Sequence, residues 1–275
     1  MKRRITAIVL SVISLISIAL VFTRTPILNI ISVYDTWVSD SKYFDYYALA
    51  YNITKSRETL RFLTEYYSMK GDNYDKLKPY FDDVFEIRNK YSQDGLDYNA
   101  FTYTDEFYVR FLLSNGKLTE ADEYCDKCIA EGEYEKIHSL MYYIAIGGVY
   151  SDLKNWGFRK LEAIVQSDAF QKNIQEAIEP SLTGIHKYFV WSEYAHALFV
   201  RGEYDLALNE IEKMADNKAN GDSIIGATLN LIDFEAETNE NAKRFIKESI
   251  DILENSDCAD SEYVERMKEL HLTAE

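Results

Sequence analysis

The chain has 275 residues, of which 47% are hydrophobic, and its formal net charge at pH 7 is −16. The hydrophobic content excludes an intrinsically disordered protein. The acidity argues against nucleic-acid binding, because a negative surface repels phosphates. Three cysteines are too few for a disulfide framework. Apolar residues recur at helical spacing nearly throughout, so we expect an all-α fold.

The first 28 residues differ from the rest. Lys2, Arg3 and Arg4 precede an uncharged apolar run over residues 5–22. A helix of this length spans roughly 27 Å, enough to cross the hydrocarbon core of a bilayer. Basic residues stay on the cytoplasmic side. Residues 1–28 therefore predict a single-pass membrane anchor, with the rest of the chain extracytoplasmic (periplasmic). A cleaved signal peptide and a buried core helix are the alternatives.

Residues 29–54 are expected to form a membrane-proximal helical connection, and residues 55–275 the main domain. Within that domain, five segments read as two helices joined by a turn: 60–84, 102–134, 136–165, 191–214 and 224–253. The segment 102–134 has Gly116 in its turn and Ala121 in its second helix. Cys125 and Cys128 follow at core positions of that helix, which predicts buried, packed thiols rather than a metal or redox site.

The segment 191–214 has the most regular pattern. Small and aromatic residues alternate at helical spacing around a Gly-Glu-Tyr turn, and the pattern resembles the tetratricopeptide repeat. The resemblance implies a helical-repeat solenoid of about five helix pairs over residues 55–275, with a capping helix from residue 261. The spacing between turns varies, and inserted loops at 93–98 and 167–183 would explain this. The expected repeat-core residues are Trp191, Ala195, Leu198, Gly202, Tyr204, Ala207, Gly116 and Ala121.

In this family the first helix of each pair lines a concave surface that receives a peptide or a partner helix. The resemblance thus implies a protein or peptide partner and an aromatic groove with a few polar groups. Phe189 is also expected to face outward. The alternative is that Phe189, Phe199 and Tyr103 are core residues between irregular repeats. The candidate groove residues are Tyr103, Glu106, Arg110, Ser192, His196 and Phe199.

Motifs of enzymes and of metal or cofactor sites are absent from the sequence. We therefore expect a protein that is not an enzyme and carries no cofactor or metal. The leading hypothesis is a membrane-anchored interaction module, a scaffold or adaptor held in the membrane by residues 5–22. The main alternative is an envelope glycan- or peptide-binding protein, released if a signal is cleaved. A hydrolase of envelope polymer with paired carboxylates is a third hypothesis.

Overall fold

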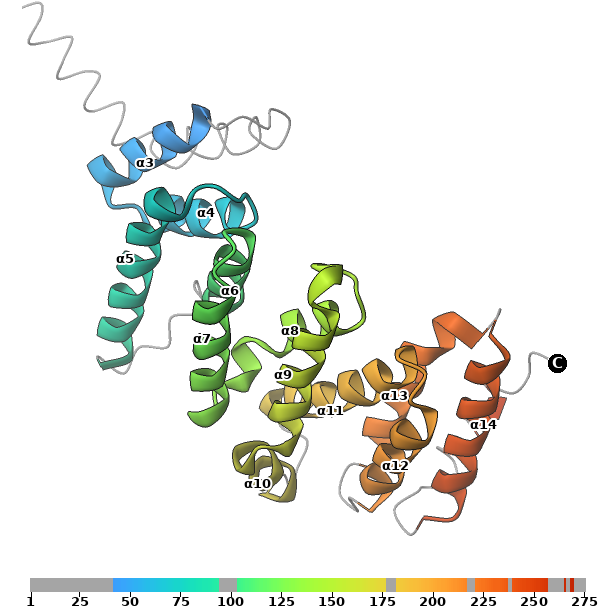
Figure 1. Cartoon of the computed structure of the whole chain (residues 1–275). Coiled ribbons are helices and arrows are strands. Elements are labelled where there is room, and N and C mark those ends of the chain that lie inside the picture. The colour runs from blue at the N-terminus through green and yellow to red at the C-terminus, as the bar shows by residue number, and fades with distance from the viewer. Residues whose placement is uncertain are drawn as a thin grey trace, which may run out of the picture. The chain divides into compact units, whose positions relative to one another are not determined.

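The computed structural model describes residues 42–93, 103–176, 182–216, 221–236 and 239–256, with residues 265, 268 and 269. Within these ranges the regular structure is entirely helical, which confirms the all-α class (Figure 1). Among these described helices, none has the length and apolar character needed to cross a membrane. The apolar run at 5–22 and most of the expected capping helix lie outside the described residues.

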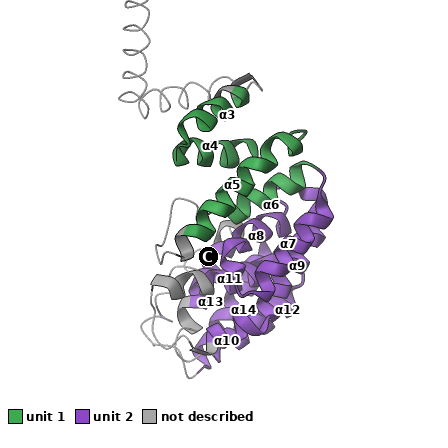
Figure 2. Ribbon diagram, turned by 90° about the vertical axis from the view of Figure 1, so that its left-hand side faces the viewer, with its two compact units in different colours: residues 1–115 green, residues 116–275 purple. Residues whose placement is uncertain are grey.

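The chain divides into two compact units, residues 1–115 and residues 116–275 (Figure 2). In unit 1 the described α-helices are α3 (Lys42–Thr54), α4 (Arg57–Tyr67), α5 (Tyr74–Gln93) and α6 (Thr104–Ser114). In unit 2 they are α7 (Leu118–Ala130), α8 (His138–Ala145), α9 (Lys154–Gln166), α10 (Asp168–Glu176), α11 (Leu182–Val200), α12 (Tyr204–Ala215), α13 (Gly221–Ala236) and α14 (Glu240–Glu254).

Each of the five segments expected to hold a helix pair overlaps two of these α-helices. The segment 167–183 differs from expectation. It holds α10 and the start of α11 rather than a loop, because Phe170 and Ile174 bury against the domain and so stabilise a further helix.

In unit 1, α4 contacts three helices, α3, α5 and α6. The turn between α4 and α5 packs against the end of α6. A Cβ on Gly71 would come within 2.6 Å of the carbonyl oxygen of Ser114, so only glycine fits there. The Ser114 hydroxyl donates to the carbonyl of Ser68 at 2.6 Å. Farther along, Arg88 of α5 forms an ion pair with the buried Asp105 of α6.

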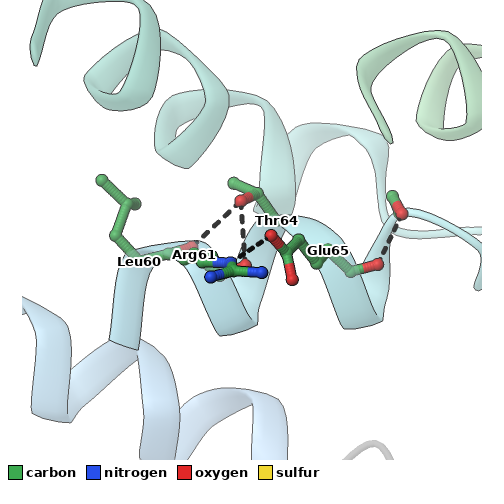
Figure 3. A network of polar contacts seen from close by, with 5 residues as sticks. Leu60, Arg61, Thr64 and Glu65 are labelled. Carbon is green, nitrogen blue, oxygen red and sulfur yellow. Dashed lines mark hydrogen bonds and ion pairs between the residues drawn. The ribbon is translucent and has the colours of Figure 1, made fainter. Parts of the chain in front are cut away.

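Several polar side chains in α4 and at its C-terminal end interact within this segment (Figure 3). The Thr64 hydroxyl lies 3.1 Å from the carbonyl oxygens of both Leu60 and Arg61. Arg61 forms an ion pair with Glu65 one turn later, and the Ser68 hydroxyl donates to the Glu65 carbonyl at 2.7 Å. The Arg61–Glu65 ion pair stabilises the helix locally, and the other bonds satisfy the Thr64 and Ser68 hydroxyls with carbonyls of the same helix.

In unit 2, consecutive helices form antiparallel pairs that also contact the neighbouring pair. α8 packs on α9, α11 on α12, and α13 on α14. Between pairs, α11 contacts α8, α9 and α13, and α12 contacts α13 and α14. α11 is therefore covered by helices on most of its sides, which buries nearly every described side chain from Val190 to Phe199.

Glycine ends several of these helices in a way that the sequence signals. After α11, Gly202 has φ +77° and donates to the carbonyl of Phe199 at 2.8 Å, while Glu203 donates to that of Leu198 at 3.0 Å. This is the Schellman arrangement, which a left-handed residue requires. Gly132 and Gly147 end α7 and α8 with the same pair of bonds.

One glycine inside a helix has a different role. Gly157 lies where α9 crosses α8, and a Cβ there would come within 2.6 Å of Cγ2 and 2.7 Å of Cβ of Ile144. It would also lie 3.0 Å from the backbone nitrogen of Ala145. The missing side chain lets the two helices approach closely.

Candidate functional site

The candidate groove residues of unit 1 lie at the start and middle of α6. Tyr103 precedes the helix and is 60% exposed. Glu106 and Arg110 are one turn apart, and the Arg110 guanidinium donates to Oε1 of Glu106 through Nη2 at 2.8 Å and Nε at 3.2 Å. Both side chains are about 15% exposed. Tyr103 is thus the accessible member of this group, and the ion pair holds the other two against the helix.

The candidate groove residues of unit 2 are buried, and the expectation that they face outward is wrong. Ser192 is fully buried, and its hydroxyl donates to the carbonyl of Ile224 on α13 at 3.1 Å. His196 is 6% exposed and Phe199 is 2% exposed. The Phe199 ring packs 5.3 Å from that of Phe245 on α14. Helical spacing places these residues on the side of α11 that its neighbours α8, α13 and α14 cover.

His196 is the buried histidine among the candidate groove residues. Its Nδ1 lies 2.8 Å from the hydroxyl of Tyr142 on α8, and its ring stacks on that of Phe199. Burial removes the imidazolium from water and lowers the pKa of His196 to about 4. The side chain is therefore a neutral core histidine at pH 7, with a role in joining α8 to α11.

A second polar contact joins the same helices one turn earlier. Nδ1 of His138 lies 2.8 Å from Oε2 of Glu193, and both side chains are at least largely buried. The two contacts pair residues 138 with 193 and 142 with 196, so α8 and α11 run in the same direction. This pair reaches the surface at Glu193, which keeps 13% of its side chain exposed.

Among the described residues of unit 2, the exposed aromatic side chains lie on these same two helices. Tyr143 of α8 is 48% exposed, and Phe189 of α11 is 44% exposed. The exposure expected for Phe189 is confirmed. Accessible aromatic side chains offer a large contact area at a small cost in conformational entropy.

The expected repeat-core residues are mostly where the pattern placed them. The side chains of Trp191, Ala195, Leu198, Ala207 and Ala121 are all buried. Tyr204 is half-buried, its ring 5.2 Å from that of Phe199. Gly116 and Gly202 lie at exposed turns with positive φ. These residues therefore act in packing and in helix termination.

A charged cluster between α7 and α9 was not anticipated from the sequence. Lys160 is 7% exposed, and its amino group lies 2.7 Å from Asp122 and 2.6 Å from Asp126. The indole of Trp156 donates to Asp122 at 2.6 Å. Burial disfavours the Lys160 charge, yet the two carboxylates overcome this and raise its pKa. Asp122, despite burial, has a lowered pKa through Lys160 and Trp156.

The signal for this cluster was present as two i, i+4 pairs, 122 with 126 and 156 with 160. It could be assembled only once α7 and α9 were known to be neighbours. Every polar group in the cluster has a partner inside it. The cluster is therefore a structural contact between the helices rather than a reactive site.

Cys125 is a free, fully buried thiol beside this cluster, and Cys128 is 3% exposed. Burial raises the pKa of Cys125 far above its ordinary value, so it is not a reactive thiolate at pH 7. This agrees with the expectation of packed side chains. In the part of the chain that the structure describes, no group of His, Cys, Asp and Glu side chains is arranged to hold a metal ion.

Charge divides unevenly between the two units. Residues 1–115 hold 14 Lys and Arg and 14 Asp and Glu. Residues 116–275 hold 16 Lys and Arg and 32 Asp and Glu. Unit 1 is therefore neutral in total, and the whole net charge of −16 belongs to unit 2.

The chain matches no protein-family model, and no curated protein or solved structure is significantly similar to it. The class that its own geometry defines is an all-α protein built of successive helix pairs.

Proposed function

We propose that this chain is a membrane-anchored protein–protein interaction module, a scaffold or adaptor that acts by binding and not by catalysis. Its helical domain lies on the extracytoplasmic side, and residues 5–22 hold it in the membrane. The orientation follows from the basic residues before the apolar run, since Lys and Arg remain cytoplasmic.

The observation that carries the proposal is the register between α7 and α9. Asp122 bonds to Trp156, and Asp126 to Lys160, so both contacts join residues 34 apart. This spacing equals the period of a tetratricopeptide repeat. It supports a TPR-like array in which the second helices of successive pairs lie side by side and parallel.

The first helices support the same arrangement with a longer interval. α8 and α11 run parallel, but His138 and Glu193 are 55 residues apart. The difference is explained by α10, which adds a helix between the two pairs. Stacked helix pairs expose long surfaces and usually serve to bind other proteins.

Exposed aromatic residues support a partner-binding surface in unit 2. Tyr143 and Phe189 stand on the first helices of successive pairs. The alternative of glycan binding loses one of its grounds, because both described tryptophans, Trp156 and Trp191, are buried and unable to stack on a sugar.

The proposal is tested by photo-crosslinking in native membranes. A benzoylphenylalanine residue replaces Tyr143, Phe189 or, as a control, Leu206, which is 53% exposed on the second helix α12. We expect the same protein adduct from positions 143 and 189 and none from position 206. Equal adducts from all three positions, or none from any, would contradict the proposal. A C-terminal reporter that is active only outside the cytoplasm tests the orientation separately.

A further inference from the structure

The outer face of α3 carries two exposed aliphatic side chains. Leu49 is 57% exposed and Ile53 is 73% exposed. They are four residues apart, so they lie on one side of the helix. Exposed apolar residues are common singly, but here two occupy adjacent turns of one rigid element.

The opposite face of α3 is held firmly by its own unit. The Phe44 ring packs edge-on against that of Tyr67 on α4, with centroids 5.0 Å apart. The Tyr51 hydroxyl donates to Asp83 of α5 at 2.8 Å. α3 therefore presents Leu49 and Ile53 in a fixed direction, and no rearrangement of the unit is needed to bring both into contact with a surface.

The chain before α3 keeps this face near the membrane if residues 5–22 span it, and to that extent the inference rests on the proposed function. Residues 23–41 join the apolar run to the helix. A segment of this length reaches at most about 65 Å when fully extended, so α3 stays within that distance of the bilayer. Because the chain is tethered, the effective concentration of the bilayer surface at α3 is high, and weak apolar contacts suffice to hold α3 on that surface.

Charge favours unit 1 as the part that touches lipid. With Lys2, Arg3 and Arg4 on the cytoplasmic side, residues 23–115 hold 11 Lys and Arg and 14 Asp and Glu, a net charge of −3. Anionic headgroups therefore repel this part of the chain far less than unit 2, which has 16 excess negative charges. Exposed Lys55 lies two residues after Ile53, just beyond the end of α3, and exposed Asp45 lies one turn before Leu49. Contact is therefore expected over the C-terminal half of the helix.

We propose that the outer face of α3, through Leu49 and Ile53, lies on the lipid surface of the membrane that holds residues 5–22. The contact would orient unit 1 against the bilayer. It is an interfacial contact of two side chains and not a second membrane span.

The test uses the full chain reconstituted in vesicles of phosphatidylcholine and phosphatidylglycerol, with a fluorescent nitrobenzoxadiazole label on one introduced cysteine. The labelled variants are Leu49→Cys, Ile53→Cys and the control Leu206→Cys, whose native side chain is 53% exposed on α12. All carry Cys258→Ser. Cys125 and Cys128 are buried and do not label under native conditions, and protein without an introduced cysteine serves as the blank.

Flotation of the vesicles reports the anchor, and quenching by doxyl-labelled lipid reports the α3 contact. We expect flotation, with at least about twofold quenching at positions 49 and 53 and little at 206, because interfacial helices sink ~5–10 Å into the headgroup region. Flotation without quenching at 49 and 53 would overturn the α3 contact and leave the anchor standing. A spectral shift at 53 that grows with protein density, without quenching, would assign the face to a second copy and also overturn it. Failure to float would overturn the anchor and this contact together.

Discussion

Protonation of His196 should make unit 2 sensitive to acid. The pKa of His196 falls from its ordinary 6.5 to about 4 on folding, because burial disfavours the imidazolium. The unfolded chain therefore binds a proton at a higher pH than the folded chain does. The stabilisation is complete above about pH 6.5 and is lost as the pH falls toward 4.

The size of this effect follows from the same two values. A difference of about 2.5 pKa units is ~3 kcal/mol in the free energy of unfolding once the histidine is fully protonated. At pH 5 the loss is about 2 kcal/mol, since the unfolded state is then almost fully protonated and the folded state is not. The His196 side chain is 6% exposed, so solvent screening removes little of this loss in stability.

The assay compares wild type with His196→Asn, which keeps a polar atom near Tyr142 but does not titrate. Urea unfolding is followed by tryptophan fluorescence between pH 7.5 and 5, with Trp37→Phe in both proteins so that the remaining Trp156 and Trp191 report unit 2. We expect wild type to lose about 2 kcal/mol more than the variant over this range. Other titrating groups cancel in the comparison. Parallel pH profiles for the two proteins would refute the argument.

Three packing predictions are checked by thermal unfolding. Gly157→Ala gains about 1 kcal/mol of helix propensity but forces α8 and α9 apart, so we expect a net loss of about 1–2 kcal/mol in stability. The control is Gly148→Ala, whose Cβ would meet nothing closer than 3.4 Å. Its stability should change little. Ala207→Trp overpacks a fully buried site and should lose about 1–3 kcal/mol in stability. The control Glu203→Lys breaks an exposed ion pair and should lose well under about 1 kcal/mol. Equal melting temperatures for Ala207→Trp and wild type would remove the helix-pair assignment. Lys160→Ala removes the cation between Asp122 and Asp126 and should lower stability by about 1 kcal/mol at pH 7, because both carboxylates are partly exposed. The difference from wild type should shrink in acid as Asp122, whose pKa Lys160 lowers, becomes protonated. A loss independent of pH would show that packing alone matters there.

Local signals in the sequence determined the helical class and several helix ends. Apolar residues at helical spacing place Ala195 and Leu198 in the core, where the structure has them. Gly202 ends α11 because a left-handed residue is needed for the Schellman bonds, a requirement confined to a few neighbouring residues. The burial of Cys125 likewise follows from its place on the apolar face of one helix.

Tertiary structure decided which surfaces remain accessible. Periodicity shows that a helix has an apolar side, but it does not show how many neighbours the helix will have. Ser192, His196 and Phe199 lie outside the main apolar stripe of α11, yet α8, α13 and α14 cover them. The pairing of Lys160 with Asp126 depends in the same way on contact between helices separated by a third. Such contacts join residues far apart in the chain, and no local pattern encodes which helices meet, because that outcome depends on how all the apolar faces are buried together.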